Sequence, residues 1–175
     1  MKFWPVPHLM VDSIYDVSAE TLKGQGVSLL FIDVDNTIAP YSDNNVYPKL
    51  AEWVEGLKRE GVEPFILSNN RGQRPKIFAD ALGIGYAGRA RKPFAKILRC
   101  VLEEKGVPRE RAAIVGDQIY TDVLCASLAG IFSVLVRPIS LKNPLLAARY
   151  GLEMPFRLIY RLRQRRSKRG DNARK

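Results

Sequence analysis

Short apolar runs recur along the first 136 residues and are separated by longer, partly polar stretches. The runs cover residues 27–32, 62–67, 84–87, 112–115 and 131–136. A run that is apolar throughout is typical of a central strand whose two faces are both covered. We therefore predict five strands, each of which has its side chains buried by helices above and below.

The stretches between these runs carry apolar residues at helical spacing. They predict helices over residues 13–23, 48–60, 75–82, 93–105 and 122–128. On this spacing Trp53, Ile77 and Phe94 are expected to face the core. Strands that alternate with helices describe βα units, so the predicted fold class is α/β, with a doubly wound, Rossmann-like parallel sheet of about five strands. Residues 1–10 are expected to be an extended lead-in.

Polar side chains that could carry chemistry follow four of the five runs. They are Asp33 and Asp35, then Ser68 and Asn69, then Lys92, then Asp117 and Asp122. In doubly wound sheets, active residues gather beyond the carboxyl ends of the strands. Asp33 and Asp35 are two residues apart, so both can face one small volume, where two carboxylates repel each other unless a cation lies between them. The pair therefore predicts a hard divalent metal, Mg²⁺.

This combination of residue types suits phosphoryl transfer, which needs a nucleophile, cations around the phosphoryl oxygens and an acid for the leaving group. Asp33 is the expected nucleophile and would form an aspartyl-phosphate. Asp35 would act as acid for the leaving alcohol and then as base for water. Ser68 and the backbone amides near Asn69 would bind the phosphate.

The other three residues of the set would neutralise the phosphate and hold the metal. Lys92 would neutralise the phosphate from the start of a helix, where the helix dipole helps. Asp117 is the expected third metal ligand, and Asp122 would orient it or a metal-bound water. Each motif alone is short. The alternatives are a cap or loop residue for Asp33 and Asp35, a turn or cap residue for Ser68, a surface charge for Lys92 and a turn residue for Asp117, but their order on successive strand ends favours the chemical interpretation.

These motifs together resemble the haloacid dehalogenase superfamily of phosphatases, subfamily IIIA. The DxDxT motif is matched by residues 33–37, the second-strand Ser by Ser68, the Lys by Lys92 and the GDxxxxD motif by residues 116–122. More narrowly, FIDVDNTIAP, LSNN, RKP and VGDQIYTD look like the YqeG family. The resemblance implies that Asp33, Asp117 and the backbone carbonyl of Asp35 bind the metal. That family includes mitochondrial phosphatidylglycerophosphatases, so it also implies removal of the terminal phosphate from phosphatidylglycerophosphate in phospholipid biosynthesis.

The spacing of the motifs leaves no room for a cap domain. Thirty residues separate Thr37 from Ser68 and 23 separate Ser68 from Lys92, and the predicted loops, helices and strands use them all. An uncapped site is open to solvent and would enclose a small metabolite poorly. We therefore expect a phosphate carried by something large: a lipid headgroup, a protein or a nucleic-acid end.

Charge divides the chain into two parts. The net charge of +10 is carried entirely by residues 137–175, which hold 12 of the 28 Lys and Arg against Glu153 and Asp171. We predict a phosphatase core over residues 1–136 and a basic C-terminal extension over residues 137–175, partly helical or disordered. Arginines interleave with apolar residues over 156–169, which predicts peripheral contact with an anionic membrane. The same pattern would also suit nucleic acid.

Composition excludes several classes of protein. With 46% apolar and 26% charged residues the chain is an ordinary globular one, and two cysteines, Cys100 and Cys125, predict buried free thiols rather than a disulfide framework. No apolar run reaches the roughly 18 residues of a membrane span. The expected location is the cytoplasm, with peripheral contact at the inner face of the membrane. The lone His8 is expected to have a surface or packing role.

Three rival functions remain at this stage. The chain could be a phosphatase of nucleic-acid ends or phosphoproteins, or an RNA- or ribosome-binding module with a vestigial site. The second is disfavoured because pure binding gives no reason to keep Asp33, Asp35, Lys92 and Asp117 together. A phospho-receiver domain has similar residues, but its accepting Asp lies on a later strand.

Overall fold

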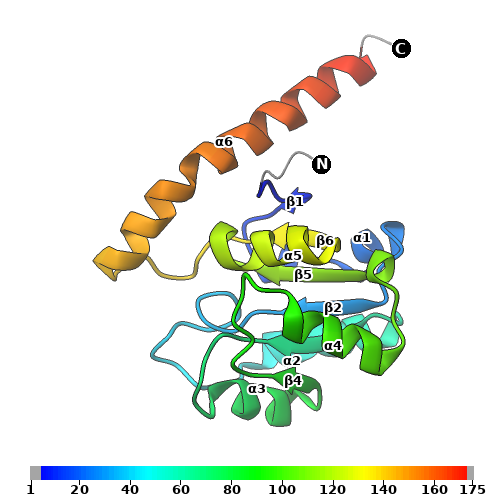
Figure 1. Cartoon of the computed structure of the whole chain (residues 1–175), viewed down its shortest axis with the longest axis vertical. Coiled ribbons are helices and arrows are strands. Elements are labelled where there is room, and N and C mark those ends of the chain that lie inside the picture. The colour runs from blue at the N-terminus through cyan, green and yellow to red at the C-terminus, as the bar shows by residue number, and fades with distance from the viewer. Residues whose placement is uncertain (1–4, 173–175) are drawn as a thin grey trace.

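Six parallel strands form one sheet at the centre of the protein (Figure 1). The computed structural model describes residues 5–172, with side chains as far as Arg165. The strands are β1 (Leu9–Met10), β2 (Leu29–Ile32), β3 (Glu63–Leu67), β4 (Gly85–Ala87), β5 (Ala112–Gly116) and β6 (Phe132–Leu135). Their order is β1-β6-β5-β2-β3-β4, and every neighbouring pair is parallel. The predicted doubly wound α/β sheet is confirmed.

Helices cover both faces of this sheet. They are α1 (Ala19–Gly24), α2 (Pro48–Arg59), α3 (Arg74–Leu82), α4 (Lys96–Lys105), α5 (Leu124–Ala129) and α6 (Pro144–Asn172). Buried residues of α1, α2 and α3 join one apolar cluster and those of α4 and α5 join another. The sheet therefore separates two cores, with α1, α2 and α3 on one face and α4 and α5 on the other, as in a doubly wound fold.

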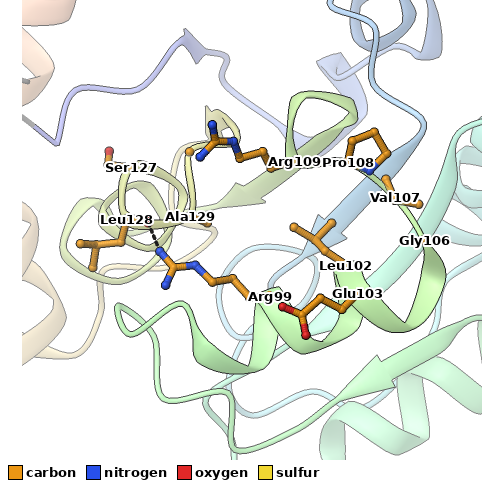
Figure 2. A pocket seen from close by; sticks show the side chains of 11 residues that line it. Arg99, Leu102, Glu103, Gly106, Val107, Pro108, Arg109, Ser127, Leu128 and Ala129 are labelled. Carbon is orange, nitrogen blue, oxygen red and sulfur yellow. Dashed lines mark hydrogen bonds between the residues drawn. The ribbon is translucent and has the colours of Figure 1, made fainter.

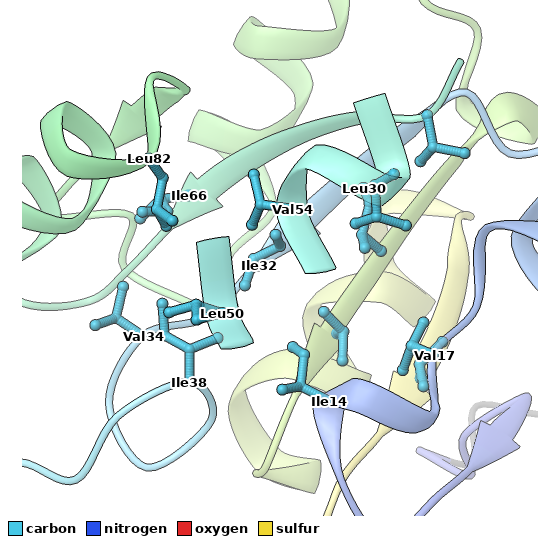
Figure 3. Packing of buried hydrophobic residues seen from close by; sticks show 14 of the residues in the cluster. Ile14, Val17, Leu30, Ile32, Val34, Ile38, Leu50, Val54, Ile66 and Leu82 are labelled. Carbon is cyan, nitrogen blue, oxygen red and sulfur yellow. The ribbon is translucent and has the colours of Figure 1, made fainter. Parts of the chain in front are cut away.

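The core under α2 and α3 fixes the strand that bears the acidic motif. Leu30 and Ile32 of β2 point into it and pack with Leu50 and Val54 of α2 (Figure 3). On the opposite face of β2, Leu29 and Phe31 enter the second cluster. Because β2 is buried on both faces and paired with β3 and β5, the position of its carboxyl end is tightly determined.

Several local predictions differ from the structure. The predicted helix over 13–23 is divided into a 3₁₀ turn (Ile14–Asp16) and α1, each capped by a serine side chain. The helix predicted from Pro93 begins at Lys96, and Phe94 is 70% exposed. Ile77 is also exposed rather than buried. Helical spacing tells which residues share a face, but not how much of the face a neighbour covers.

The sequence also made predictions for the two cysteines, His8 and Trp53. Cys125 is buried as predicted, whereas Cys100 is exposed. Burial raises the pKa of the Cys125 thiol to about 12. His8 stacks on Phe132 and hydrogen-bonds Ser133, in the segment that adds β1 to the edge of the sheet. Trp53 is half-buried against the first core and donates from Nε1 to the carbonyl of Val17.

Two features of the layout bear on access to the strand ends. Between β2 and β3 lie only a loop and α2, and between β3 and β4 only a loop and α3, so no cap domain is present in residues 5–172. α6 follows β6 and extends beyond the α/β core (Figure 1). Among the residues described, none of the helices combines the length and the apolar character that a membrane span requires.

Candidate active site

Lys92 lies between two carboxylates at the carboxyl edge of the sheet. Its Nζ is 2.7 Å from Oδ1 of Asp33 and 2.6 Å from Oδ1 of Asp122. All three side chains are buried, with exposures of 5%, 6% and 1%. Although burial lowers the pKa of Lys92, the two carboxylates outweigh this and raise it, so the ammonium is charged. Residues from three segments that are remote in sequence are therefore held together by one buried cation.

Asp117 completes an acidic cluster beside this lysine. The Thr37 hydroxyl lies 3.1 Å from Oδ2 of Asp33 and 3.3 Å from Oδ1 of Asp117. Carboxylate oxygens of Asp33, Asp117 and Asp122 all lie within 4.8 Å of one another. Burial raises the pKa of Asp33 to about 6, against the lowering effect of Lys92. Burial and the neighbouring carboxylate of Asp33 raise the pKa of Asp117 well above its usual value.

This cluster has the chemistry of a divalent-cation site. Three buried carboxylates face a single ammonium, so negative charge is in excess. Burial, and after it the neighbouring carboxylates, raise the pKa of Asp33 and Asp117, so holding both ionised is unfavourable without a further cation. A cation ligated by Asp33 and Asp117 would relieve the excess. The donors are all oxygen atoms, which Mg²⁺ and Ca²⁺ prefer over the nitrogen and sulfur ligands typical of zinc. The residues present therefore fit the predicted metal.

The glycine of the fourth motif is required by the close approach of Asp122. A Cβ at Gly116 would lie 2.3 Å from both Cγ and Oδ2 of Asp122. Asp122 also accepts hydrogen bonds from the Gln118 amide at 3.2 Å and the Thr121 hydroxyl at 3.2 Å. It belongs to a π-helical turn (Ile119–Val123) that leads into α5, where the sequence predicted the first turn of an ordinary helix. The turn directs its carboxylate back toward Lys92.

Ser68 and Asn69 lie at the carboxyl end of the neighbouring strand β3. Ser68 is fully buried, and its hydroxyl accepts a hydrogen bond from the Asn70 amide at 3.1 Å. The Asn69 side chain donates to the carbonyl of Lys92 at 2.9 Å and accepts from its amide at 2.6 Å. Asn69 therefore fixes the main chain at Lys92. Since α4 begins four residues later, Lys92 is not at a helix start, and the predicted contribution of a helix dipole is wrong.

Asp35 lies beside the cluster but has partners of its own. Oδ1 is 2.7 Å from Nε of Arg74, and Oδ2 accepts from Nδ2 of Asn70 at 3.2 Å. Arg74 is buried, and its guanidinium also donates to backbone carbonyls of residues 39, 40 and 43. Sequence reasoning did not identify Arg74 or Asn70 as neighbours of the site. Together they hold Asp35 and the loop that follows it in one arrangement.

Side chains of the C-terminal helix α6 hydrogen-bond the loop that carries Asp117 and hold it in place. Nη2 of Arg157 donates to the Asp117 carbonyl at 3.0 Å and pairs with Glu153 at 3.1 Å. Glu153 in turn accepts the Ile119 amide at 2.8 Å, and both charged side chains are buried. Arg157 belongs to the segment 156–169 that is predicted to contact a membrane or nucleic acid, yet its charge is buried and not available for either. The tail residues from 166 onward lie outside the described side chains.

Tyr41 forms a further wall of the site. It is 49% exposed, on the loop after the acidic motif, and Nε2 of Gln118 lies 3.5 Å from its hydroxyl. Burial and the carboxylates of Asp117, Asp35 and Asp33 raise the pKa of Tyr41. The structure thus brings Lys92 into direct contact with Asp33 and Asp122, and Asp117 lies within 4.8 Å of both carboxylates. Ser68 and Asn69 lie on the next strand end, and Asp35 is turned toward Arg74.

One cavity lies away from the acidic cluster. It has a volume of about 730 Å³ and lies between the C-terminal ends of α4 and α5 (Figure 2). Arg99 crosses it and donates to the carbonyl of Leu128. These helix ends precede β5 and β6, so the cavity lies at the amino edge of the sheet, opposite the acidic cluster. It takes no part in the chemistry of the site.

Comparison with known proteins gives a family match that spans the first five strands, β1 to β5, and the residues of the site. The family model for haloacid dehalogenase-like hydrolases matches residues 6–130. A Bacillus subtilis protein named Probable phosphatase YqeG is 30% identical over 165 residues, which are 94% of this chain and 95% of that protein. The mitochondrial phosphatidylglycerophosphatase of Saccharomyces cerevisiae is 28% identical over 145 residues, 75% of this chain and 77% of its own length.

Solved structures agree on the fold. The cobalt-bound deoxy-D-mannose-octulosonate 8-phosphate phosphatase from Haemophilus influenzae superposes with a TM-score of 0.50 and 14% identity, over 64% of this chain and 69% of that chain. At this identity the likeness concerns the arrangement of strands and helices alone.

Proposed function

Because the chain belongs to the haloacid dehalogenase-like hydrolases, we propose that it is a magnesium-dependent phosphatase that forms an aspartyl-phosphate on Asp33. The observation that carries the proposal is the contact of Lys92 with Asp33 and Asp122, beside Asp117, at the carboxyl ends of adjacent strands. This arrangement supports the proposal, because the carboxylate of Asp33, the ammonium of Lys92 and the carboxylates of Asp117 and Asp122 surround one small volume.

In the first step, a carboxylate oxygen of Asp33 attacks phosphorus and the bond to the leaving alcohol breaks. Lys92 offsets the charge on the phosphoryl oxygens, and the Ser68 hydroxyl and the amides that follow it donate hydrogen bonds to them. Asp35 gives a proton to the departing alkoxide. For that, its contact with Arg74 must lengthen as substrate binds.

In the second step, Asp35 takes a proton from water, which attacks the aspartyl-phosphate. The phosphate leaves and the Asp33 carboxylate is restored, so the net reaction consumes one water for each phosphomonoester. Asp33, Asp117 and the Asp35 backbone carbonyl would hold Mg²⁺, with Asp122 and Lys92 behind them. When bound, the ion would neutralise the phosphoryl group and help to orient it.

The substrate that we favour is phosphatidylglycerophosphate. Two observations support it: the similarity to the yeast enzyme with that name, and a site without a cap domain, which leaves room for a phosphate presented by a membrane surface. Exposed Leu158, Arg161 and Leu162 on α6 support peripheral contact with an anionic bilayer. The test is inorganic phosphate release with Mg²⁺ from lipid, nucleotide, sugar, phosphopeptide and 5′-phosphorylated oligonucleotide substrates.

The lipid should be the preferred substrate in that comparison, and the Asp33→Asn variant should release none. Preference for the oligonucleotide or the phosphopeptide would replace the lipid assignment and retain the phosphatase. If none of the substrates released phosphate and the protein bound RNA in a salt-sensitive manner, the phosphatase proposal would fail in favour of a binding module.

Metal binding should stabilise the folded protein. With Mg²⁺ at about 100 times its Kd, a single site that exists only in the folded state adds about 2.7 kcal/mol to the free energy of unfolding. For a chain of this size that raises Tm by roughly 5–10 °C. We expect this rise in thermal denaturation of the metal-free protein after Mg²⁺ is added. Asp117→Asn should abolish it, whereas the exposed Asp80→Asn should not. An equal rise in the Asp117→Asn protein would place the ion elsewhere.

A further inference from the structure

Three arginines next to the candidate active site have no role in the proposed phosphatase mechanism. Arg71, Arg89 and Arg91, together with Asn69, line a cavity of about 430 Å³. All three arginines are exposed. Within residues 5–165, none of their guanidinium groups has an ion pair or hydrogen bond to another residue. Three like charges therefore face one volume with no acidic side chain to offset them.

The cavity adjoins the position expected for the transferred phosphate. Asn69 follows the fully buried Ser68, and Arg91 precedes Lys92, whose ammonium contacts Asp33. Along residues 89–92 the side chains alternate: Ala90 and Lys92 are buried, while Arg89 and Arg91 are exposed and line the cavity. The same short segment thus supplies one cation to the catalytic cluster and two to the neighbouring cavity.

The backbone of this segment is held in an unfavourable conformation. Arg89 has φ 52° and Arg91 has φ 55°, both in the left-handed region, where a non-glycine residue costs about 1–2 kcal/mol. Hydrogen bonds to the loop after β3 hold it there: Arg89 donates to the carbonyl of Asn70, and Ala90 to that of Ser68. Such strain concentrates at functional sites, where the surrounding structure maintains it.

We propose that Arg71, Arg89 and Arg91 form a second anion subsite, which binds a phosphodiester or other phosphate on the same substrate molecule as the phosphomonoester. The inference rests on the proposed function, since it takes the cluster around Asp33 as the place of phosphoryl transfer. Guanidinium groups suit phosphate oxygens because they offer paired, planar donors and remain charged at all relevant pH values. The expected substrate therefore carries two phosphates separated by a few bonds.

The test compares two soluble phosphomonoesters that differ in the second anion. One is glycerol 3-phosphate; the other is glycerophosphoglycerophosphate, which adds a phosphodiester. Binding is measured by calorimetry with Mg²⁺ and full-length Asp33→Asn protein, so that hydrolysis does not interfere. We expect the diester-bearing compound to bind at least about tenfold more tightly. In the same background, Arg89→Gln/Arg91→Gln should reduce that advantage to about twofold or less, and Arg91→Lys should retain part of it.

A matched control is Arg59→Gln. Arg59 is an exposed arginine at the C-terminal end of α2, which leads to the amino end of β3, and its loss should leave the ratio of affinities unchanged. Equal affinity for the two compounds in the protein with all arginines intact would overturn the subsite. So would an advantage that survives the double substitution.

Two further measurements distinguish a failure of the proposed function from a failure of the anion subsite. Phosphate release by the unsubstituted protein tests the proposed function. If neither compound and none of the lipid, nucleotide, sugar, phosphopeptide and oligonucleotide substrates releases phosphate, that function fails, while the binding ratio still decides the subsite. The same headgroup presented as phosphatidylglycerophosphate in phosphatidylcholine vesicles identifies the source of the second phosphate. Faster release from vesicles than from the soluble compound indicates a lipid, and slower release indicates a free bisphosphorylated metabolite.

Discussion

Replacing Asp33 with Asn should lower the rate of phosphate release by on the order of 10³-fold or more, because the substituted side chain cannot form the aspartyl-phosphate. The fold should persist. Asn is nearly isosteric, and it removes one buried negative charge from a cluster in which burial already raises the pKa of Asp33 to about 6. We therefore expect the Tm of the metal-free variant to equal or exceed that of the unsubstituted protein, while activity disappears.

The measurement is steady-state phosphate release beside thermal denaturation of the same preparation. Asp80→Asn is the matched control, since Asp80 is an exposed carboxylate on α3 that pairs with Lys76; it should retain full activity. A rate within tenfold of normal in the Asp33→Asn protein would mean that Asp33 is not the nucleophile. A large fall in Tm would mean that its carboxylate is needed for the fold rather than for the reaction.

Replacing Arg157 with Met should destabilise the protein by about 3–5 kcal/mol, the usual cost of leaving one member of a buried ion pair without its partner. Glu153 is 1% exposed, and burial already raises its pKa with Arg157 present. The Asp117 carbonyl would also lose its donor. For a chain of this size the Tm should fall by roughly 6–20 °C. Activity should fall as well, because the loop that carries Asp117 is no longer held by the hydrogen bond from Arg157.

Two further variants identify the cause of the destabilisation by Arg157→Met. Glu153→Gln/Arg157→Met should recover part of the lost stability, since Gln is neutral and can still accept the Ile119 amide. The exposed Arg161→Met, one turn further along α6, should change the free energy of unfolding by less than about 0.5 kcal/mol. If Arg157→Met were as stable as Arg161→Met, the contacts of Arg157 with Glu153 and the Asp117 carbonyl would not stabilise the site.

The destabilisation by Arg157→Met should also depend on pH. A carboxyl group whose pKa is raised in the folded state binds its proton there before it does in the unfolded chain. The folded variant is therefore stabilised, relative to the unfolded one, as the pH falls through the range in which Glu153 takes up a proton. Urea denaturation at several pH values should show the difference from the unsubstituted protein shrinking toward acid pH. A difference that grows toward acid pH would contradict an unpaired Glu153 as its source.

The sheet and the order of the candidate site residues were predictable because both depend on local patterns. Continuous apolar runs identified β2, β3 and β5, and the polar residues directly after them necessarily meet at one edge of a parallel sheet. β1 could not be found in this way, because two residues carry no periodicity. Exposure was predicted wrongly for Phe94 because it depends on what packs beyond the helix, which no local pattern contains.

The contacts that shape the site were not predictable for a related reason. Arg74 reaches Asp35 across 39 residues of sequence, and Arg157 reaches the Asp117 carbonyl across 40. Neither arginine stands in a motif, and Arg157 lies in a run of basic residues that suggested a solvated surface. Only the packing of α6 against the loop after β5 gives it a buried acceptor and a buried partner. Long-range pairs of this kind require the three-dimensional structure.

The most direct test of the central claim, that Asp33 accepts the phosphoryl group, is to locate that group on the enzyme. Asp35→Asn should slow hydrolysis of the intermediate more than its formation from an activated phosphomonoester with a good leaving group, so the phosphorylated enzyme should accumulate. After acid quenching during turnover and proteolysis, mass spectrometry should find one phosphoryl group on Asp33. A phosphoryl group on another residue, or turnover in which the enzyme remains unmodified and solvent oxygen enters phosphate directly, would contradict the account.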